Sequence, residues 1–578
     1  MQRRRTGLGC LLVAATLWAV SAIPAFSQTA AQASQTGAAG SSTDAISTLK
    51  QQLAAQQKQL EQMQAAMAAL QKKLDQADRS SAATQSAQAQ TAKATPAAQP
   101  SAFHVPGQPA SLGQVASLSP VVPRAPEGSA AQPAVPVLAD PGFFNGASPA
   151  EEHGESPLSV KIGGAEFTPG GFMDFTTVFR STNVGSGIGT SFGGVPFSNT
   201  PQGRLTETRM SMQNSRVSLD VNSKFQGWDL HGHLEADFLG NAPANVFVGS
   251  NSNTLRSRLY WIDARKDKFE FMGGQSWSLI VPGRDGISPN PSDIFYSQNM
   301  DTNYQVGLTW SRQAQFRMVY HPSKTIAAAI SIEDPQQFVG GSTLPSTLPA
   351  NEVETGGGNT ATPNVFPDII GKVAFDPKKG GLHQHIEFVG MLTSARIYDP
   401  TANQKSSAEG AGGSVNFNLQ LTKSLHFILN TFYSDGGGRY IFALGPGFVV
   451  RPDASGILGP AMLHSGSGIA GFEWQANKNS LVYVYYGAAY FGRYVATDPV
   501  TGKLIGYGYT GSSNSQNRAI NEPTIGLTQT FWKNPHYGAL QLLTQYSYVT
   551  RAPWYVSTGS PKDAHSSMAW VDLRYVLP

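Results

Sequence analysis

The feature that most constrains the fold is an alternation of apolar and polar residues with a period of two, which runs from Leu158 to Pro578. It is clearest at residues 228–238, 325–332 and 415–421, where every second side chain is apolar and those between are polar or small. Successive side chains of a β-strand point to opposite faces of a sheet. The alternation therefore predicts strands with one apolar and one polar face, and we find no convincing amphipathic helix in this part of the chain.

The connections between the predicted strands alternate in length. Short connections fall at residues 222–227, 266–268, 321–324, 376–383, 422–424, 476–480 and 533–537. Long connections fall at residues 181–208, 239–254, 278–303, 334–364, 398–411, 436–466, 495–521 and 551–567. Seven short and eight long connections join sixteen strands, and such a pattern is typical of a transmembrane barrel with both ends on one side. Residues 158–578 are therefore predicted to form an all-β transmembrane barrel of about sixteen antiparallel strands.

The composition fits a barrel wall and excludes other classes of protein. The chain has 60 Gly, 29 Phe and 19 Tyr, only 14% of its residues are charged, and its mean hydropathy is −0.22. Lipid-facing apolar residues and lumen-facing polar residues offset each other in such an average. Cys10 is the only cysteine, which excludes a disulfide framework and thiolate chemistry in the mature chain. We find no catalytic motif and predict neither an enzyme nor a cofactor.

The N-terminus has the pattern of a secretory signal peptide, residues 1–27. Arg3 to Arg5 precede an apolar run from Leu8 to Ala25, and small residues stand at Ala25 and Ser27. Removal of the three arginines lowers the formal charge from +3 to zero, which gives no indication of a nucleic-acid partner. Export together with a barrel predicts the bacterial outer membrane, with its lipid as a partner. An uncleaved membrane anchor is the alternative.

A short α-helical coiled coil is predicted at residues 45–77, after a flexible stretch at 28–44. Apolar residues recur there at alternating spacings of three and four, a heptad seam in which Gln56 is the clearly polar core position. The stripe is too narrow to fold alone, so we expect identical neighbours in the periplasm; a helix docked on its own barrel is the alternative. Residues 78–157 form an Ala/Pro/Gln-rich linker. The predicted core residues are Ile46, Leu49, Leu53, Gln56, Leu60, Met63, Met67, Leu70 and Leu74.

Five stretches within the predicted strands carry a family resemblance. They are SRVSLD (215–220), LEADF (234–238), RSRLY (256–260), GQSW (274–277) and SIEDP (331–335). With the coiled coil and the linker, this arrangement resembles the DcaP-like trimeric porins. The resemblance implies a sixteen-stranded homotrimer with periplasmic helices that passes small anionic solutes such as dicarboxylates.

The last strand of the chain predicts a further partner. Its alternate residues from Ala569 to Leu577 are apolar or aromatic, which resembles the signal that the barrel-assembly machinery reads. Pro578 departs from that signal, because the final residue is not aromatic.

Six basic residues lie in the polar set of the strands. They are predicted to line the channel and to determine its selectivity for solutes: Arg216, Arg256, Arg258, Arg317, Lys372 and Arg574. Arginine binds carboxylates through two parallel hydrogen bonds and keeps its charge at every relevant pH. A ladder of such groups lowers the electrostatic barrier for anions while each group binds weakly enough to release them. We therefore expect passive, anion-leaning diffusion of small hydrophilic solutes. Alternatively, these residues brace the wall by pairing with Asp220, Glu235, Asp237 or Glu333.

The long connection at residues 278–303 follows the fifth strand, where general porins fold a loop into the channel. Its prolines stiffen it, and it carries charge at Arg284, Asp285 and Asp293. The prediction is a constriction loop with Arg284 near the narrowest point; an ordinary external loop is the alternative.

Two further interpretations of the sequence concern a metal site and a structural role. His231, His233 and Glu235 share a strand face, but neighbours on that face lie about 6.6 Å apart, which is wide for one ion, so no metal site is predicted. The other is a structural tether or adhesin, in which the coiled coil binds peptidoglycan or another partner and the barrel is only an anchor.

Overall fold

The structure is a computed structural model that describes residues 156–240, 253–289, 300–335, 338–349, 351–355, 363–442 and 445–578. The predicted signal peptide, coiled coil and nearly all of the linker lie outside these residues and stay predictions. Among the described residues, no helix is both long and apolar enough to cross a membrane. Their helical elements are three short 3-10 turns, η1 (Phe192–Gly194), η2 (Gln202–Arg204) and η3 (Gly438–Tyr440).

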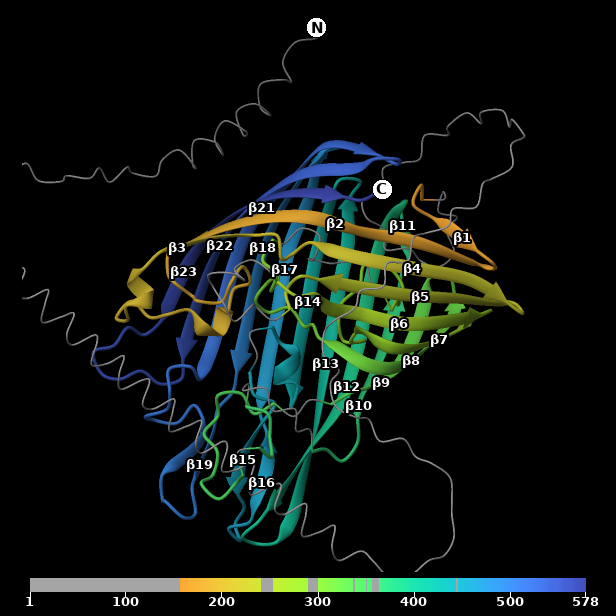
Figure 1. Cartoon of the computed structure of the whole chain (residues 1–578). Helices are drawn as coiled ribbons and strands as arrows, with labels where there is room; N and C mark the ends of the chain where they lie inside the picture. The colour runs from red at the N-terminus through yellow and green to blue at the C-terminus, as the bar shows by residue number, and fades with distance from the viewer. Residues whose placement is uncertain are drawn as a thin grey trace, which may run out of the picture. The chain divides into compact units, whose positions relative to one another are not determined.

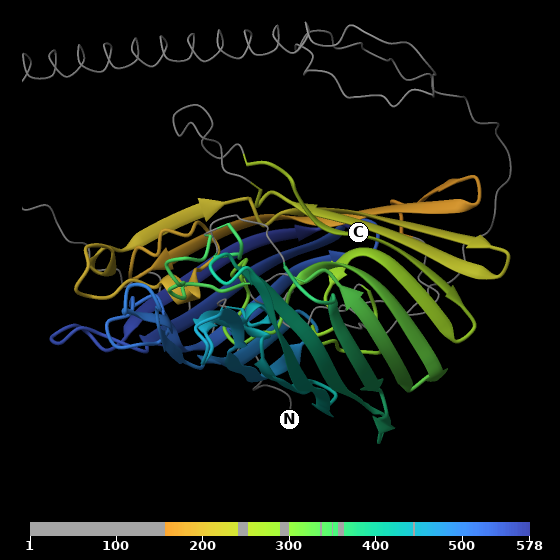
Figure 2. The ribbon, with the colours of Figure 1, turned by 90° about the horizontal axis from the view of Figure 1, so that it is seen from below.

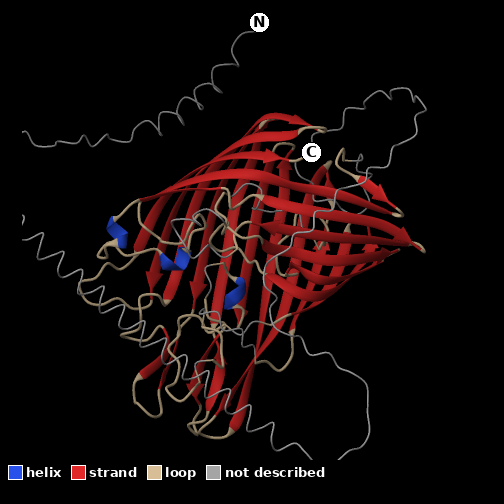
Figure 3. Cartoon of the chain, viewed as in Figure 1, coloured by secondary structure: helices blue, strands red, loops and turns tan. Residues whose placement is uncertain are grey.

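Sixteen antiparallel strands follow one another around a closed barrel, which confirms the predicted strand number and class (Figures 1, 2 and 3). Each strand pairs with the next of the series, and the last pairs with the first, for example at Phe175 and Leu573. The strands are β2 (Ala165–Arg180), β4 (Arg216–Phe225), β5 (Trp228–Asp237), β6 (Arg256–Lys266), β7 (Phe269–Trp277), β8 (Arg312–Ser323), β9 (Ile326–Glu333), β10 (Asp368–Phe375), β12 (Leu382–Asp399), β13 (Gln404–Thr422), β14 (Leu425–Asp435), β17 (His464–Asn477), β18 (Ser480–Phe491), β21 (Asn517–Asn534), β22 (Gly538–Pro553) and β23 (Ala564–Val576).

Shorter strands complete the sheet and its loops. β3 (Glu207–Ser211) pairs with the second half of β2, and β4 pairs with the first half. The remaining short strands extend turns or form hairpins within loops: β1 (Val160–Ile162), β11 (Lys378–Lys379), β15 (Phe448–Pro452) with β16 (Leu458–Met462), and β19 (Tyr494–Thr497) with β20 (Leu504–Tyr507).

The connections follow the predicted alternation of short and long with one exception. All seven predicted short connections are turns between neighbouring strands. The predicted long connection at 398–411 is wrong, because β12 and β13 continue to a tight turn at residues 400–403. Residues 404–410 are mostly polar on both faces, so the alternation that marks a wall strand disappears although the backbone still pairs.

The barrel is apolar outside and polar inside, as β8 illustrates. Phe316 and Met318 are 76% and 41% exposed on the outer face, whereas Gln315 and Arg317 are 5% and 4% exposed. Polar inner residues are buried because inward-folded segments of the long loops cover them. The distribution is the reverse of a water-soluble sandwich, whose apolar faces pack together.

The seam that closes the barrel contains a buried charge cluster. Arg574 on β23 lies opposite Asp174 on β2, and its Nε donates to Asp174 Oδ2 at 2.9 Å. Its Nη2 also donates to Asp572 Oδ2 at 3.2 Å, and all three side chains are nearly inaccessible. One guanidinium therefore serves two carboxylates at the place where the sheet must close.

Replacing Arg574 by methionine should lower the free energy of unfolding by about 3–5 kcal/mol, because two buried carboxylates lose their cation. The measurement is urea unfolding of the purified protein in detergent. Lys224→Met is the matched control, since Lys224 and Asp229 form an exposed pair at 3.1 Å and should contribute less than about 1 kcal/mol. Equal losses in the two variants would contradict the role of the seam cluster.

Candidate functional site

The loop between β7 and β8 folds into the barrel, and two of its segments are described, residues 278–289 and 300–311. Leu279, Ile280 and Val281 are fully buried in the first segment, and Met300 and Leu308 in the second. We call this loop the inward loop. It is longer than predicted, because residues 304–311 continue along the interior before β8 begins at Arg312.

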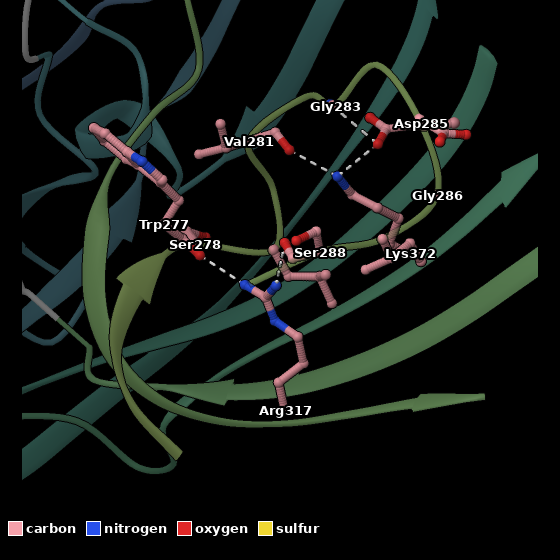
Figure 4. A pocket seen from close by; sticks show the side chains of 12 residues that line it. Trp277, Ser278, Val281, Gly283, Asp285, Gly286, Ser288, Arg317 and Lys372 are labelled. Atoms are coloured by element: carbon pink, nitrogen blue, oxygen red, sulfur yellow. Dashed lines mark hydrogen bonds and ion pairs between the residues drawn. The ribbon is translucent and has the colours of Figure 1, made fainter. Parts of the chain in front are cut away.

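Two wall cations hold the first segment of the inward loop (Figure 4). Arg317 donates from Nη2 to Trp277 O at 2.7 Å and from Nη1 to Ser288 O at 3.0 Å. Lys372 donates to Val281 O at 2.7 Å and to Glu387 Oε1 at 3.0 Å. The space between these groups is about 10 Å³, enough for about one water molecule. Arg317 and Lys372, predicted to line the channel, thus bind the loop.

The charged residues of the inward loop also reach the wall. Arg284 forms a bidentate pair with Glu473 on β17, at 2.8 Å from Nη1 and 2.7 Å from Nη2. Gly286 N donates to Asp376 Oδ2 at 3.1 Å, and Asp285 is half-exposed beside His383. Burial acts to raise the pKa of Asp376, but hydrogen bonds from the two neighbouring histidines outweigh it and hold this pKa below its ordinary value. Asp293 lies outside the described residues.

The second segment of the inward loop packs on the opposite wall. Val306 N donates to Glu522 Oε2 at 2.9 Å, and Gln305 Nε2 donates to Glu522 O at 2.8 Å. The backbone approaches β18 so closely that a Cβ atom on Gly487 would lie 1.9 Å from Val306 O. Asp301 is wholly buried, and this burial raises the pKa of its carboxyl group. Both segments are therefore fixed to the inner face of the barrel.

Four arginines gather on the long-loop side of the inward loop; we call Arg216, Arg256, Arg258 and Arg312 the arginine cluster. Two carboxylates accompany them. Asp237 binds Arg256 at 2.7 Å and Arg258 at 2.9 Å, while Glu235 contacts Arg258 and lies 3.8 Å from Arg216. Tyr304 OH accepts hydrogen bonds of 3.1 Å from both Arg216 and Arg258. Counting these six ionic groups, the cluster carries two more positive than negative charges.

Arg312 is the member that sequence reasoning missed. It is an odd number of residues from Arg317, so the alternation assigns it to the opposite, lipid-facing set. Its guanidinium lies 5.6 Å from the Trp277 ring centre, and that of Arg258 lies 5.8 Å from the same ring. The buried Arg312 Nη1 has no hydrogen-bond partner among the described residues. Its position at the start of β8, beside the loop, was not readable from periodicity.

A cavity of about 230 Å³ opens beside the arginine cluster. Arg256 and Trp310 line it, together with polar groups from three loops, Ser186, Gln213, Thr302 and Asn303. It is large enough for several water molecules or a small solute. A positively charged, hydrogen-bonding space of this kind suits a small anion.

The remaining predicted residues serve the wall. Arg574 lies in the seam cluster described above. His231 Nε2 and His233 Nδ1 both bind Asp220 Oδ1, at 2.9 and 2.8 Å, while Glu235 turns to Arg258. These histidines and Glu235 therefore do not converge on one point. The alternative prediction, that wall arginines pair with Glu235 and Asp237, holds for part of the arginine cluster. It does not account for the two positive charges that remain in excess.

A closed barrel of sixteen strands with a charged interior is the architecture of porins. The outer membrane channel DcaP of Acinetobacter baumannii has a similar fold, with a TM-score of 0.52 and 15% identity over 72% of this chain and 99% of that chain. The anion-selective porin from Comamonas acidovorans has a TM-score of 0.40 and 11% identity, over 72% and 100% of the two chains. OprB of Pseudomonas putida has the same score and identity, over 71% and 94%.

The likeness to DcaP shows the fold alone. No family model and no curated protein matches the chain.

Gly487→Ala should destabilise the protein by about 1–3 kcal/mol, because the added methyl group overlaps Val306 O of the inward loop. The readout is the free energy of unfolding in detergent. Gly390→Ala is the matched control, since a Cβ atom there meets nothing within 4 Å and both variants lose the same unfolded-state entropy. If the two substitutions had equal effects, the loop would not press on β18.

Proposed function

We propose that this protein is an outer-membrane porin through which small hydrophilic solutes diffuse passively, with a preference for anions. The observation that carries the proposal is the charge excess of the arginine cluster inside a barrel whose outer face is apolar. The charge excess supports the preference for anions, and the apolar outer face supports the location in a membrane.

The outer wall supports a membrane location. Large apolar side chains stand exposed on strands all around the barrel, and in water so much contiguous apolar surface would drive aggregation. A closed barrel satisfies every wall hydrogen bond internally, which the hydrocarbon core of a membrane requires. Examples from separate strands are Ile262 at 68%, Phe316 at 76%, Phe388 at 51%, Ile525 at 52% and Leu573 at 47% exposed.

The lumen supports an anion preference. Arginine stays charged throughout the accessible pH range, so the excess of two positive charges is permanent. A charge-lined cleft with low-dielectric walls concentrates ions of opposite sign. The cavity beside Arg256 gives such an ion a place to rest before it passes the inward loop. Because the loop fills much of the interior, the solutes that pass are small. Dicarboxylates suit the neighbouring guanidinium groups of the arginine cluster and agree with the resemblance to the DcaP-like porins.

The assembly of the whole chain is also proposed. The heptad seam at residues 45–77 supports a homotrimer whose helices lie in the periplasm. The apolar alternation of the last strand supports recognition by the barrel-assembly machinery, and the N-terminal residues support export by a cleaved signal peptide.

The test is the reversal potential of purified protein in planar bilayers under a salt gradient. The wild type should conduct with an anion-selective sign. Arg312→Gln and Arg256→Gln should each lower the anion-to-cation permeability ratio by at least about threefold, since a unit charge about 6 Å from an ion in water contributes about 0.7 kcal/mol.

Lys224→Gln removes an exposed charge at a short turn and should leave the ratio unchanged. Absence of any conductance would overturn the porin. A cation-selective wild type, or unchanged ratios in both arginine variants, would overturn the anion preference.

A further inference from the structure

Two carboxylates and one imidazole converge where the inward loop meets the short-turn end of the barrel. Asp285 belongs to the loop, Asp376 follows β10, and His383 is the second residue of β12. His383 Nε2 lies 3.4 Å from Asp285 Oδ1 and 3.3 Å from Asp376 Oδ1. One ligand atom from each of the three residues lies within 4.8 Å of the other two. Asp285 and His383 are 48% and 32% exposed at their side chains, so the point is open to ions from solution.

These separations are long for charge-assisted hydrogen bonds, and they also suit a shared cation. A charge-assisted hydrogen bond between nitrogen and oxygen is about 2.7–2.9 Å long, shorter than both distances here. Zinc holds its nitrogen and oxygen ligands at about 2.0–2.1 Å in a tetrahedron, whose edge is then about 3.3 Å. The two distances from His383 Nε2 match that edge, and water from the open side would supply a fourth ligand.

The wall side of the cluster is oriented by its own hydrogen bonds. Asp376 Oδ1 lies 2.6 Å from His385 Nδ1, and Asp376 Oδ2 accepts from Gly286 N at 3.1 Å. His385 in turn has its Nε2 at 3.1 Å from Glu387. Such partners behind a ligand fix its direction before the metal arrives and raise the affinity of the site.

We propose that Asp285, Asp376 and His383 bind a divalent cation of the zinc class, which fastens the inward loop to the barrel wall. Mixed imidazole and carboxylate ligands suit zinc and its transition-metal neighbours, whereas calcium takes six to eight oxygens. Among the described residues, the loop contributes Asp285 and the wall contributes the other two ligands, so the cation would bridge loop and wall. Its neighbour Arg284 is already anchored to Glu473. The cation would hold the same turn from a second side.

The experiment measures zinc binding by the purified full-length protein in detergent, in competition with a chromophoric chelator. The wild type should bind about one zinc per chain. Asp285→Asn and His383→Gln should each weaken zinc binding by at least about tenfold. Both side chains are partly exposed, and circular dichroism of the β-sheet verifies that each variant is folded.

His464→Asn is the matched control. His464 also contacts an aspartate, Asp435, but it is exposed and belongs to no three-ligand group among the described residues. The control should bind zinc as the wild type does. No saturable binding by the wild type, or equal affinity in the wild type and both cluster variants, would overturn the proposal and leave an ion pair centred on a protonated His383. The assay involves no solute or current, so its result is independent of the test of channel function.

Discussion

Closure of the sheet between β2 and β23 is the constraint on which the rest of the structure depends. An open sheet exposes a row of unpaired N–H and C=O groups, and no edge of that kind is tolerated in hydrocarbon. Closure also encloses the polar set of side chains. Arg574 shows how the two requirements meet, because the residue that pairs in register with Asp174 across the seam also neutralises it. Once the wall is closed, every inward charge must find a partner inside the lumen or remain available to a solute.

Two of the inward cations and two of the inward carboxylates position the inward loop. Arg317 and Lys372 donate to its carbonyl groups, and Glu473 and Glu522 accept from its side chain and backbone. In this part of the interior, the charges of the wall are therefore matched to the inward loop. Displacing the described segments of the loop would leave several buried polar groups without partners, which favours the inward position.

The sequence predicted the wall well because its signal is strictly periodic. The sixteen strands and the seven short turns follow from alternation and turn residues alone. The first residues of β13, 404–410, were missed because both of their faces are mostly polar, so pairing with β12 continues where the alternation stops. The destinations of Lys372 and Arg317 were not predictable, since the carbonyl groups that receive them belong to an aperiodic loop. For the same reason periodicity could not find Arg312, whose place depends on where that loop returns to the wall.

The distribution of charge partners distinguishes arginines that stabilise the wall from those proposed to attract anions. Arg574 binds two carboxylates at the seam. Elsewhere in the interior, Arg180 forms an ion pair with Glu207 at 2.9 Å, and Arg439 forms one with Asp368 at 2.6 Å. If the arginine cluster only braced the wall, the same matching would be expected there. Instead three guanidinium groups share Asp237 and Glu235, and the fourth, that of Arg312, lies with Arg258 near the ring of Trp277. An aromatic ring stabilises a cation without neutralising it. The positive charge is thus supported by the fold yet left uncancelled, beside the cavity that a small anion would enter.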